Sequence, residues 1–454
     1  MATSFKVQLS RENVGVFHTS RISDEALVKA SELLQENHEK HHIFFNADGF
    51  HNHIVHHLLT LVALGASPSI IEEQYDRNKS YQRPVTLNQE KPPERQIVHD
   101  MHDEAKFDAH LAQDAHYYDY LVFFQQEIEA KGWEAVLNDY VFKGDQRADD
   151  MLARMLDGLL HPIIHLGFGV EFKQPAIIAE ALAQAAMHTT KYAPYLVSTE
   201  KAAAAETSST RTSIVSMLDE IRSNDKVATA AHWSDPNKLM GGVWARAADD
   251  MQAIAQKFKV TPSELEVRTA EAINAAAYFA GAAQHPPKEI KYDFFHIHST
   301  NSSIFLSVFL QQPWLSTINK VRLLEWKVRV DLLVYASRRA AKPFLDDIVN
   351  YRPKQQAKSS SKENEGGPWD RIIERVNALD DDGHAAKLVR ALLHGQVVSR
   401  PYDDRDEFII KDAMWLQLGH MAIDSVEGQQ QHWVRSAGFE EAWENIGERP
   451  RAQL

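Results

Sequence analysis

The chain has 454 residues, 44% of them hydrophobic and 25% charged, a composition typical of a globular protein with a large buried core. Its formal net charge is -14 with the histidines neutral, so we do not expect a basic surface for nucleic acid or an anionic membrane. The sequence has no cysteine, which excludes disulfides, thiolate nucleophiles, iron–sulfur clusters and cysteine-ligated zinc. Any bound metal must therefore be held by His, Asp, Glu or a modified side chain.

The beginning of the sequence, Met-Ala-Thr-Ser-Phe-Lys-Val, lacks the apolar core of a secretory signal. Later in the chain we find no run of roughly 18 apolar residues, the length that a membrane-spanning helix needs. We therefore expect a cytoplasmic protein with no membrane partner, and its oligomeric state is left open.

Helical periodicity dominates the chain, and no two-residue alternation is long enough to build a sheet. Capping residues mark several helix ends, including Ser67-Pro68 and the capping box that runs from Thr261 to Glu264. The sequence predicts an all-α fold, a large multi-helix bundle enclosing a buried, histidine-rich metal and substrate pocket. The predicted helices cover residues 24–42, 51–64, 67–75, 104–130, 148–160, 174–190, 211–222, 241–257, 261–284, 301–311, 315–340, 383–393 and 405–426.

Residues 352–369 form a polar, low-complexity stretch that has nothing to bury. Because histidine-bearing helices are predicted on both sides of it, we interpret it as a disordered loop inserted into one domain. No internal repeat divides the chain, so a single domain covering residues 1–454 is expected.

Histidines are concentrated early in the chain, with seven of the 23 between residues 38 and 57. The apolar residues around the last four leave no polar stripe, which predicts a buried helix. On a helix, His53 shares a face with His56 or with His57, and either pair can converge on one ion. The alternative is that these are core histidines bonded to backbone carbonyls.

His38-Glu39-Lys40-His41-His42 matches the zinc-peptidase signature, in which two histidines bind zinc and the glutamate activates water. The segment has charged neighbours at a predicted helix end, and no Gly-x-x-His follows it. A zinc-dependent hydrolase that uses His38, Glu39 and His42 is therefore kept as an alternative function.

Two more apolar segments each carry a pair of histidines. His161 and His165 share a face if the chain stays helical through Pro162. His296 and His298 come just before a predicted helix, and only one of them can face a given side.

His384 and Lys387 are three residues apart on a predicted helix, so both can point into the same interior. A buried lysine loses its charge and becomes a nucleophile or a base. A neutral amine can also take up carbon dioxide and form a carbamate, which coordinates metal as a carboxylate does. The alternative is that Lys387 extends to the surface.

The segment from Trp326 to Asp331 places Lys327 and Arg329 in apolar surroundings. Buried charges are costly unless they are paired, so internal ion pairs are expected, with a role of Arg329 in clamping substrate as the alternative. The chain has no Gly-x-Gly-x-x-Gly, no P-loop and no pair of Glu-x-x-His motifs, which argues against nucleotide folds and di-iron carboxylate bundles.

Six segments, taken together and in order, resemble the questin oxidase-like family of fungal polyketide pathways. The resemblance spans roughly residues 38–425 and implies an oxygenase that opens the quinone ring of an anthraquinone with O2, in a dioxygenase-like or Baeyer–Villiger-like manner. A carrier of hydrophobic polyketides without enzyme activity is the remaining alternative. The segments are residues 49–59, 64–68, 75–84, 161–167, 326–332 and 383–387.

The resemblance also implies a metal site, because the family's histidine positions fall on residues of this chain. We expect one non-haem Fe(II), since an oxygenase needs a metal that passes electrons to dioxygen and zinc cannot. This chain has His296 where the family more often has an apolar residue, so the choice between His296 and His298 is open, as is that between His53 and His57. The expected ligands are His53, His161, His298, His384 and Lys387, with carbamylation of Lys387 kept as an open alternative to a free amine.

Around this site the resemblance implies two kinds of residue. His57 and His165 are expected to act as bases on a hydroxyanthraquinone. The residues His56, Trp326 and Arg329 are expected to contact the substrate. The family has been described as using reduced nicotinamide, but this chain has no recognisable site for NADPH, so that requirement stays open.

Overall fold

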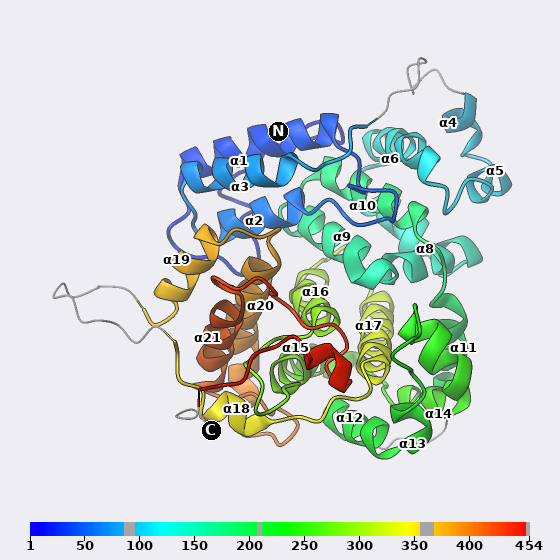
Figure 1. The fold of residues 1–454 in the computed structure, drawn as a ribbon. Helices are drawn as coiled ribbons and strands as arrows, with labels where there is room; N and C mark the ends of the chain where they lie inside the picture. Colours follow the sequence, from blue (N-terminus) through cyan, green and yellow to red (C-terminus); the bar gives the residue numbers. More distant parts are fainter. Residues whose placement is uncertain (86–95, 207–210, 355–366, 451–454) are drawn as a thin grey trace. The chain divides into compact units, whose positions relative to one another are not determined.

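The computed structural model describes residues 1–85, 96–206, 211–354 and 367–450. Within these ranges every regular element is a helix, and β-bridges occur only singly, as between Phe44 and His51 (Figure 1). The predicted all-α fold is confirmed. None of the helices in the described ranges is both long and apolar enough to cross a bilayer.

The chain forms two compact units, which are described separately. The first comprises Met1–Ala193, Ser307–Asn319 and Asp380–Lys387, and the second comprises Pro194–Leu306, Lys320–Leu379 and Leu388–Leu454. A single domain over residues 1–454 stays a prediction. The predicted disordered loop at 352–369 falls largely on residues 355–366, which lie outside the described residues.

Most of the described residues of the first unit lie in the helices α1 to α10. They are α1 (Asp24–Lys40), α2 (Ile54–Ala63), α3 (Pro68–Lys79), α4 (Gln96–Asp100), α5 (Glu104–Asp108), α6 (Tyr117–Lys131), α7 (Trp133–Leu137), α8 (Gln146–Leu156), α9 (His161–Glu171) and α10 (Pro175–Met187). Helices α1 and α3 lie side by side (Figure 1), and both pack on α2. Helix α9 packs between α2 and α10, and α10 also contacts α6. The histidines of α2 and α9 thereby meet inside this unit.

Helix α2 begins later than predicted. Its N-cap residue is His53, and the side-chain oxygen of the preceding Asn52 accepts from the backbone N–H of Ile54 at 3.0 Å. All ten residues of the helix are buried, as the apolar pattern predicts. His53 is the residue just before the helix. It therefore does not share a helix face with His57, although the sequence predicts that it does.

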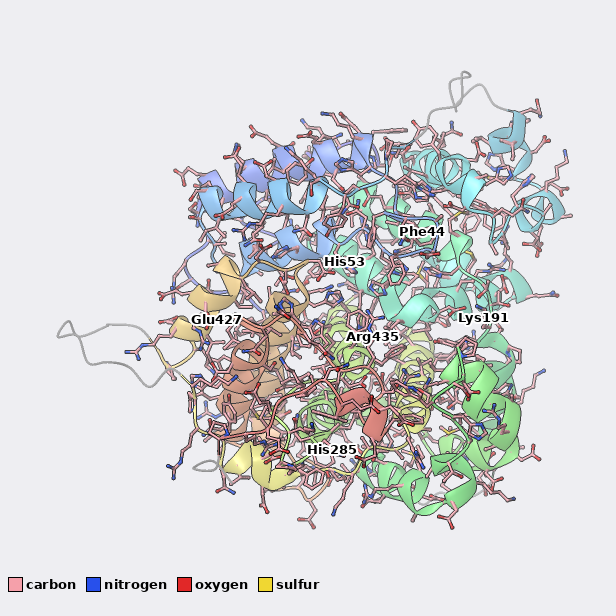
Figure 2. All side chains as sticks on the ribbon, in the orientation of Figure 1. Phe44, His53, Lys191, His285, Glu427 and Arg435 are labelled. Carbon is pink, nitrogen blue, oxygen red and sulfur yellow. The ribbon has the colours of Figure 1, made fainter. Side chains whose placement is uncertain are left out.

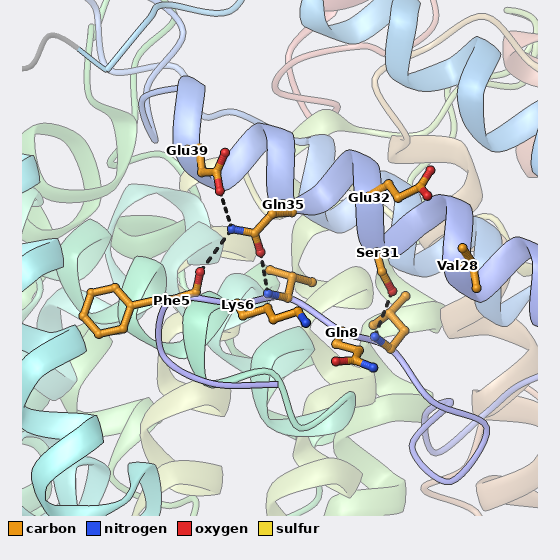
Figure 3. A pocket seen from close by; sticks show the side chains of 10 residues that line it. Phe5, Lys6, Gln8, Val28, Ser31, Glu32, Gln35 and Glu39 are labelled. Carbon is orange, nitrogen blue, oxygen red and sulfur yellow. Dashed lines mark hydrogen bonds between the residues drawn. The ribbon is translucent and has the colours of Figure 1, made fainter. Parts of the chain in front are cut away.

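Residues 5–9 lie along α1 and are held there by its side chains (Figure 3). The backbone N–H of Val7 donates to Gln35 Oε1 at 2.7 Å, and that of Leu9 donates to Ser31 Oγ at 2.9 Å. An open groove of about 610 Å³ runs between this segment and the helix. Preceding this segment, residue Ser4 reaches α6, where it contacts Gln125 and Glu129.

The second unit contains helices of very different lengths, from four residues to 21. Its helices are α11 (Ala193–Ala205), α12 (Ile214–Ser223), α13 (Asp225–Ala228), α14 (Ala245–Ala255), α15 (Leu265–Ala282), α16 (Phe294–Leu310), α17 (Thr317–Ser337), α18 (Leu345–Val349), α19 (Asp370–Ala378), α20 (His384–Ser399) and α21 (Met414–Val426), of which α16, α17 and α20 also contribute residues to the first unit. The predicted capping box at Thr261 is formed and leads into α15.

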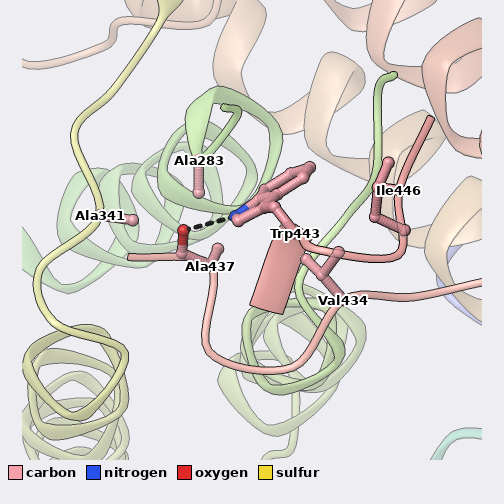
Figure 4. Close-up of a cluster of buried hydrophobic side chains, with 6 residues drawn as sticks. All are labelled: Ala283, Ala341, Val434, Ala437, Trp443 and Ile446. Carbon is pink, nitrogen blue, oxygen red and sulfur yellow. Dashed lines mark hydrogen bonds between the residues drawn. The ribbon is translucent and has the colours of Figure 1, made fainter. Parts of the chain in front are cut away.

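A small apolar cluster near the end of the chain belongs to the second unit (Figure 4). Trp443 fills its centre, and its indole N–H donates to the carbonyl of Ala437 at 2.8 Å. Ala283, Val434 and Ile446 pack around the ring. Burying the indole with its polar atom satisfied fixes the C-terminal segment onto α15.

Candidate metal and catalytic site

Three buried histidines converge in the first unit. One ring nitrogen from each of His53, His161 and His384 lies within 4.8 Å of the other two, and the described residues contain one such group. Each histidine stands at the start of a helix: His53 just before α2 (Figure 2), His161 first in α9 and His384 first in α20. Helix starts that are far apart in sequence therefore bring together three potential metal ligands.

The Nδ1 atoms of the three rings are bound to hydrogen-bond acceptors. Asp382 accepts from His53 Nδ1 at 2.9 Å and from His384 Nδ1 at 2.5 Å. The carbonyl of Gly158 accepts from His161 Nδ1 at 2.7 Å. Although burial raises it, the interactions with His384 and His53 hold the pKa of Asp382 well below its ordinary value, so its carboxylate only accepts. Each Nδ1 therefore carries a hydrogen, and in the neutral form of each ring the lone pair is on Nε2.

Two of these lone pairs face each other, because His53 Nε2 lies 2.9 Å from His161 Nε2. Neither atom has a hydrogen to donate once Nδ1 is protonated in both rings. A cation between them removes the repulsion, and two imidazoles about 2.1 Å from one ion at a right angle are about 3 Å apart. The donor set thus fits a metal ion, with Asp382 and Gly158 orienting the ligands from behind.

Three histidines of this region, His53, His56 and His57, have lowered pKa values and are neutral at physiological pH. Burial, followed by the charge of Lys387, lowers the pKa of His53 to about 3. Burial lowers the pKa of His57 to about 3 and that of His56 well below its ordinary value. Neutral imidazoles have a lone pair available to bind a metal or accept a proton.

The backbone before His161 is strained in a way that positions this residue. Gly158, Leu159 and Leu160 have φ values of +55°, +56° and +66°. Left-handed backbone costs a non-glycine residue roughly 1–2 kcal/mol, so the two leucines store strain. The turn brings the Gly158 carbonyl against His161 Nδ1. Pro162 occupies the first turn of α9, where it has no hydrogen bond to lose, so His161 and His165 stay on one continuous helix.

Asp381 and Asp382 divide two tasks at the start of α20. The carboxylate of Asp381 caps the helix by accepting from the N–H groups of Gly383 at 2.8 Å and Ala385 at 3.0 Å. Burial and the neighbouring charge of Asp382 raise the pKa of Asp381 to about 7. Asp381 thus takes the capping role and leaves Asp382 for the histidines.

Lys387 lies one turn after His384 and is buried, with 4% of its surface exposed. Its Nζ has no hydrogen-bond partner among the described residues. Burial lowers its pKa to about 8, although Asp382 and Asp381 oppose the shift. An amine in this state is neutral far more often than a surface lysine and has its lone pair available.

A second histidine network begins beside the metal-ligand candidates. His56 Nε2 lies 3.2 Å from His165 Nδ1, and His165 Nε2 lies 2.7 Å from Glu180 Oε2. The other oxygen of Glu180 lies 2.6 Å from His38 Nδ1, and His38 Nε2 lies 2.9 Å from Gln125 Nε2. Although burial raises it, the hydrogen bonds from His165 and His38 lower the pKa of Glu180 to about 2. The network is therefore anchored on a buried carboxylate.

His57 has one ring nitrogen available to accept a proton. Its Nε2 has no partner among the described residues, and its Nδ1 lies 3.5 Å from the side chain of Asn78. His165 differs because both its ring nitrogens are engaged. The two predicted bases are thus brought into the same unit as the candidate ligands, but only His57 has an unengaged nitrogen.

Sequence reasoning missed several contributors to the site. His51 stacks on His161 with ring centroids 3.8 Å apart, and its Nε2 lies 2.8 Å from His188 Nε2. The roles of Asp382 and Glu180 were also missed. A buried glutamate in the otherwise apolar helix 174–190 is the one local signal that was available, because such a group needs partners.

The remaining predicted residues lie in the second unit, where α16 begins seven residues before its predicted start and includes both histidines. His298 Nδ1 donates to the carbonyl of Phe294 at 2.6 Å, whereas neither nitrogen of His296 has a partner among the described residues. Arg329 pairs with Glu325 at 3.1 Å, and Lys327 pairs with Asp331, so internal ion pairs are found as expected. The roles proposed for His298, Trp326 and Arg329 stay predictions.

The residues of the zinc-peptidase signature have separate partners. His38 is bound to Glu180, Glu39 accepts from Gln35 at 2.8 Å beside the groove (Figure 3), and His42 follows the end of α1 and contacts Arg83. Because α1 ends at Lys40, His38 and His42 are not on one helix face. The candidate ligand group of the described residues includes neither.

The fold and the site define an all-helical protein with a candidate metal centre made of histidines. The chain belongs to the Questin oxidase-like family, whose model matches residues 50–392. It is 39% identical to the Baeyer-Villiger oxidase ptaJ of Pestalotiopsis fici, over 98% of this chain and 99% of that protein. It is 38% identical to a questin oxidase of Aspergillus fumigatus (98% of this chain, 99% of that protein) and 37% identical to one of Aspergillus terreus (98% of each). Family membership places the chain among oxidoreductases.

Proposed function

We propose that this protein is an oxygenase of polyketide metabolism that opens the quinone ring of an anthraquinone with O2 at a non-haem iron. The names of its relatives, questin oxidase and Baeyer-Villiger oxidase, support an oxidation of this class. The observation that carries the proposal is the pair of opposed Nε2 atoms of His53 and His161, 2.9 Å apart, with their Nδ1 atoms bound to acceptors. This arrangement calls for a cation.

Within the first unit, His53, His161 and His384 are the proposed ligands, and Lys387 joins them as a carbamate. Imidazole and oxygen donors accept iron, manganese or zinc alike, so the choice of iron rests on the chemistry. When bound, Fe(II) supplies the electrons that dioxygen needs in order to react with an organic substrate. Electron density extending beyond Lys387 Nζ would support the carbamate, and a bare amine would contradict it.

The protein's own residues prepare the substrate. A hydroxyanthraquinone becomes electron-rich when a base removes its phenolic proton, and His57 Nε2 is the unengaged nitrogen proposed for this task. His165 contributes through His56, since both its own nitrogens are bound. The surrounding buried side chains exclude water and so keep solvent from returning the proton to the deprotonated ring.

Oxygen uptake with an anthraquinone, measured with and without a chelator, tests the proposal. We expect uptake that depends on substrate, is lost after chelation and returns with Fe(II) but not with Zn(II). The ratio of O2 to product, with and without NADPH, separates incorporation of two oxygen atoms from a Baeyer–Villiger-type reaction that needs a reductant. Full activity in protein stripped of metal would contradict the proposal.

His298 is tested separately because it lies in the second unit. Metal analysis of untagged His298→Ala protein, next to His161→Ala, shows whether it contributes to binding. A loss of stoichiometric metal in both variants supports the full predicted ligand set. Loss in His161→Ala alone limits the set to the first unit.

A further inference from the structure

The histidine network around Glu180 joins five helices of the first unit. Its members come one each from α2, α9, α10, α1 and α6, and all are at least nine-tenths buried. They are His56, His165, Glu180, His38 and Gln125, in the order in which they are hydrogen bonded. In such a network every donor must face an acceptor, so the proton positions can be deduced from members whose roles are fixed.

The outer end of the network fixes the orientation of Gln125. The carbonyl of Ser4 only accepts, and Gln125 Nε2 donates to it at 3.0 Å. The same amide nitrogen lies 2.9 Å from His38 Nε2 and donates its second hydrogen there. His38 Nε2 is thus an acceptor, which leaves the hydrogen on Nδ1 to be donated to Glu180.

The inner end follows from Glu180. Its second oxygen accepts from His165 Nε2, so a neutral His165 has a lone pair on Nδ1. That lone pair needs a donor, and the ring nitrogen 3.2 Å away, His56 Nε2, supplies it by carrying a hydrogen. The remaining nitrogen, His56 Nδ1, is then a bare lone pair, buried and with no partner among the described residues.

From this geometry we infer that Glu180 is a positioning residue that keeps His56 Nδ1 as a hydrogen-bond acceptor for a hydroxyl group of the substrate. The inference rests on the proposed function for the identity of the substrate. It adds a specificity: the site selects a hydroxylated aromatic over its methyl ether. A hydroxyl donates to the lone pair, whereas an ether oxygen placed there faces it with a lone pair of its own.

Glu180→Gln reverses the deduced arrangement with little change in size. The new amide has one donor, which must face either His38 or His165. If the amide NH2 group faces His38, a hydrogen must move to His38 Nε2, where it meets the amide NH2 of Gln125 that Ser4 holds in place. If it faces His165, the hydrogen of His165 moves to Nδ1 and is donated to His56 Nε2. The hydrogen of His56 then moves to its Nδ1, which has no partner among the described residues. We therefore expect His165 and His56 to change tautomer together.

Nitrogen-15 NMR of the full chain labelled at histidine measures these tautomers directly, with Zn(II) bound because it is diamagnetic. The His56 signals are identified by their loss in His56→Gln. We expect hydrogen on Nε2 in the wild type and on Nδ1 in Glu180→Gln. Hydrogen on Nδ1 in the wild type overturns the inference, and so does an unchanged His56 in Glu180→Gln.

Binding of a monohydroxyanthraquinone and its methyl ether supplies the second readout. We expect the wild type to prefer the hydroxyl compound by about tenfold to a hundredfold, the cost of an unpaired buried acceptor, and Glu180→Gln to lose this preference. Glu180→Asp keeps a carboxylate and should restore both the tautomer and the preference. His38→Gln removes the other neighbour of the Glu180 carboxylate, and we expect it to leave the tautomer of His56 unchanged. If Glu180 had only a structural role, His38→Gln and Glu180→Gln would disturb His56 alike.

The two proposals fail separately. The tautomer of His56 and the ligand preference are measured without turnover. Their outcome therefore does not depend on whether the protein consumes oxygen. Iron-dependent oxygen uptake together with a wild-type His56 protonated on Nδ1 would refute only the role of Glu180. If Glu180→Gln does not fold, the wild-type tautomer and Glu180→Asp still decide the inference.

Discussion

Asp382 orients two candidate ligands with one carboxylate, because one of its oxygens accepts from His53 and the other from His384. Asn at this position has one acceptor and one donor, so one of the two rings loses its orientation and its tautomer. Loss of such a supporting partner typically lowers metal affinity about 10- to 100-fold. We therefore predict this loss for Asp382→Asn, measured by competition with a chelator.

Asp380 provides the matched control for that prediction. It lies two residues earlier, and its side chain is 80% exposed. Asp380→Asn removes the same charge from the same segment without touching a histidine, and its metal affinity should equal that of the wild type. Equal affinities in both variants would show that Asp382 does not support a metal site.

Gly383 is required for two reasons that can be separated by substitution. Its φ is +88°, and an added Cβ would lie 2.6 Å from His57 Cγ. Gly428 has a similar φ of +68° but open space around it. We predict that Gly428→Ala costs about 1 kcal/mol of unfolding free energy from the backbone alone, and that Gly383→Ala costs about 2–4 kcal/mol. Urea unfolding of the metal-free proteins measures both, and equal losses would refute the close packing on His57.

Single histidines can be recognised in the sequence, but their partners cannot. His53, His161 and His384 stand out because each interrupts or precedes an apolar run. Asp382 is one of three successive aspartates, and nothing local distinguishes the one that reaches His53, 329 residues away. The same holds for Glu180 and His38, so the sequence identifies candidate ligands while the tertiary fold selects their supporting groups.

At the scale of elements, helix periodicity predicts where helices lie better than where they begin or end. The predicted helix 104–130 is divided into α5 and α6, with Ala112 between them at a φ of +59°. The N–H of Ala112 donates to the carbonyl of Ala186, at the end of α10, at 2.8 Å. A tertiary hydrogen bond of this kind replaces the helical one and leaves no local pattern to read.

Lys291 ties the end of α21 to the segment before α16. Its buried Nζ donates to the carbonyls of Ser425, in the last turn of α21, and Gln431. Burial lowers its pKa to about 8. The unfolded chain therefore binds more protons than the folded one between about pH 8 and 10.5, so stability should rise with pH across this window.

We predict that Lys291→Met loses this rise and, at pH 7, is destabilised by about 1–3 kcal/mol because two buried carbonyls lose their donor. Urea unfolding at several pH values measures both effects. Lys226, whose side chain is 75% exposed, is the control, and Lys226→Met should keep the wild-type profile. If the stability of Lys291→Met still rises with pH, the rise comes from groups other than Lys291.

At the scale of the whole molecule, metal binding should be visible as thermal stability. An ion that binds only the folded state at 100 times its Kd adds about 2.7 kcal/mol. For 454 residues unfolding together, the usual unfolding entropy per residue converts this to a shift in Tm of about 3 °C. If the first unit, which is about half of the chain, unfolds by itself, the same free energy shifts its Tm by about 6 °C.

Scanning calorimetry of metal-loaded and chelated protein therefore tests the site and the single-domain prediction together. We expect one transition that moves by about 3 °C in the wild type, because a single domain unfolds cooperatively. His161→Ala should show no shift, since it lacks a proposed ligand. Two transitions, of which only one responds to chelation, would contradict a single domain but keep the metal site. If chelation leaves the Tm of the wild type unchanged, no cation lies between His53 and His161. Their opposed nitrogens would then have to share a proton.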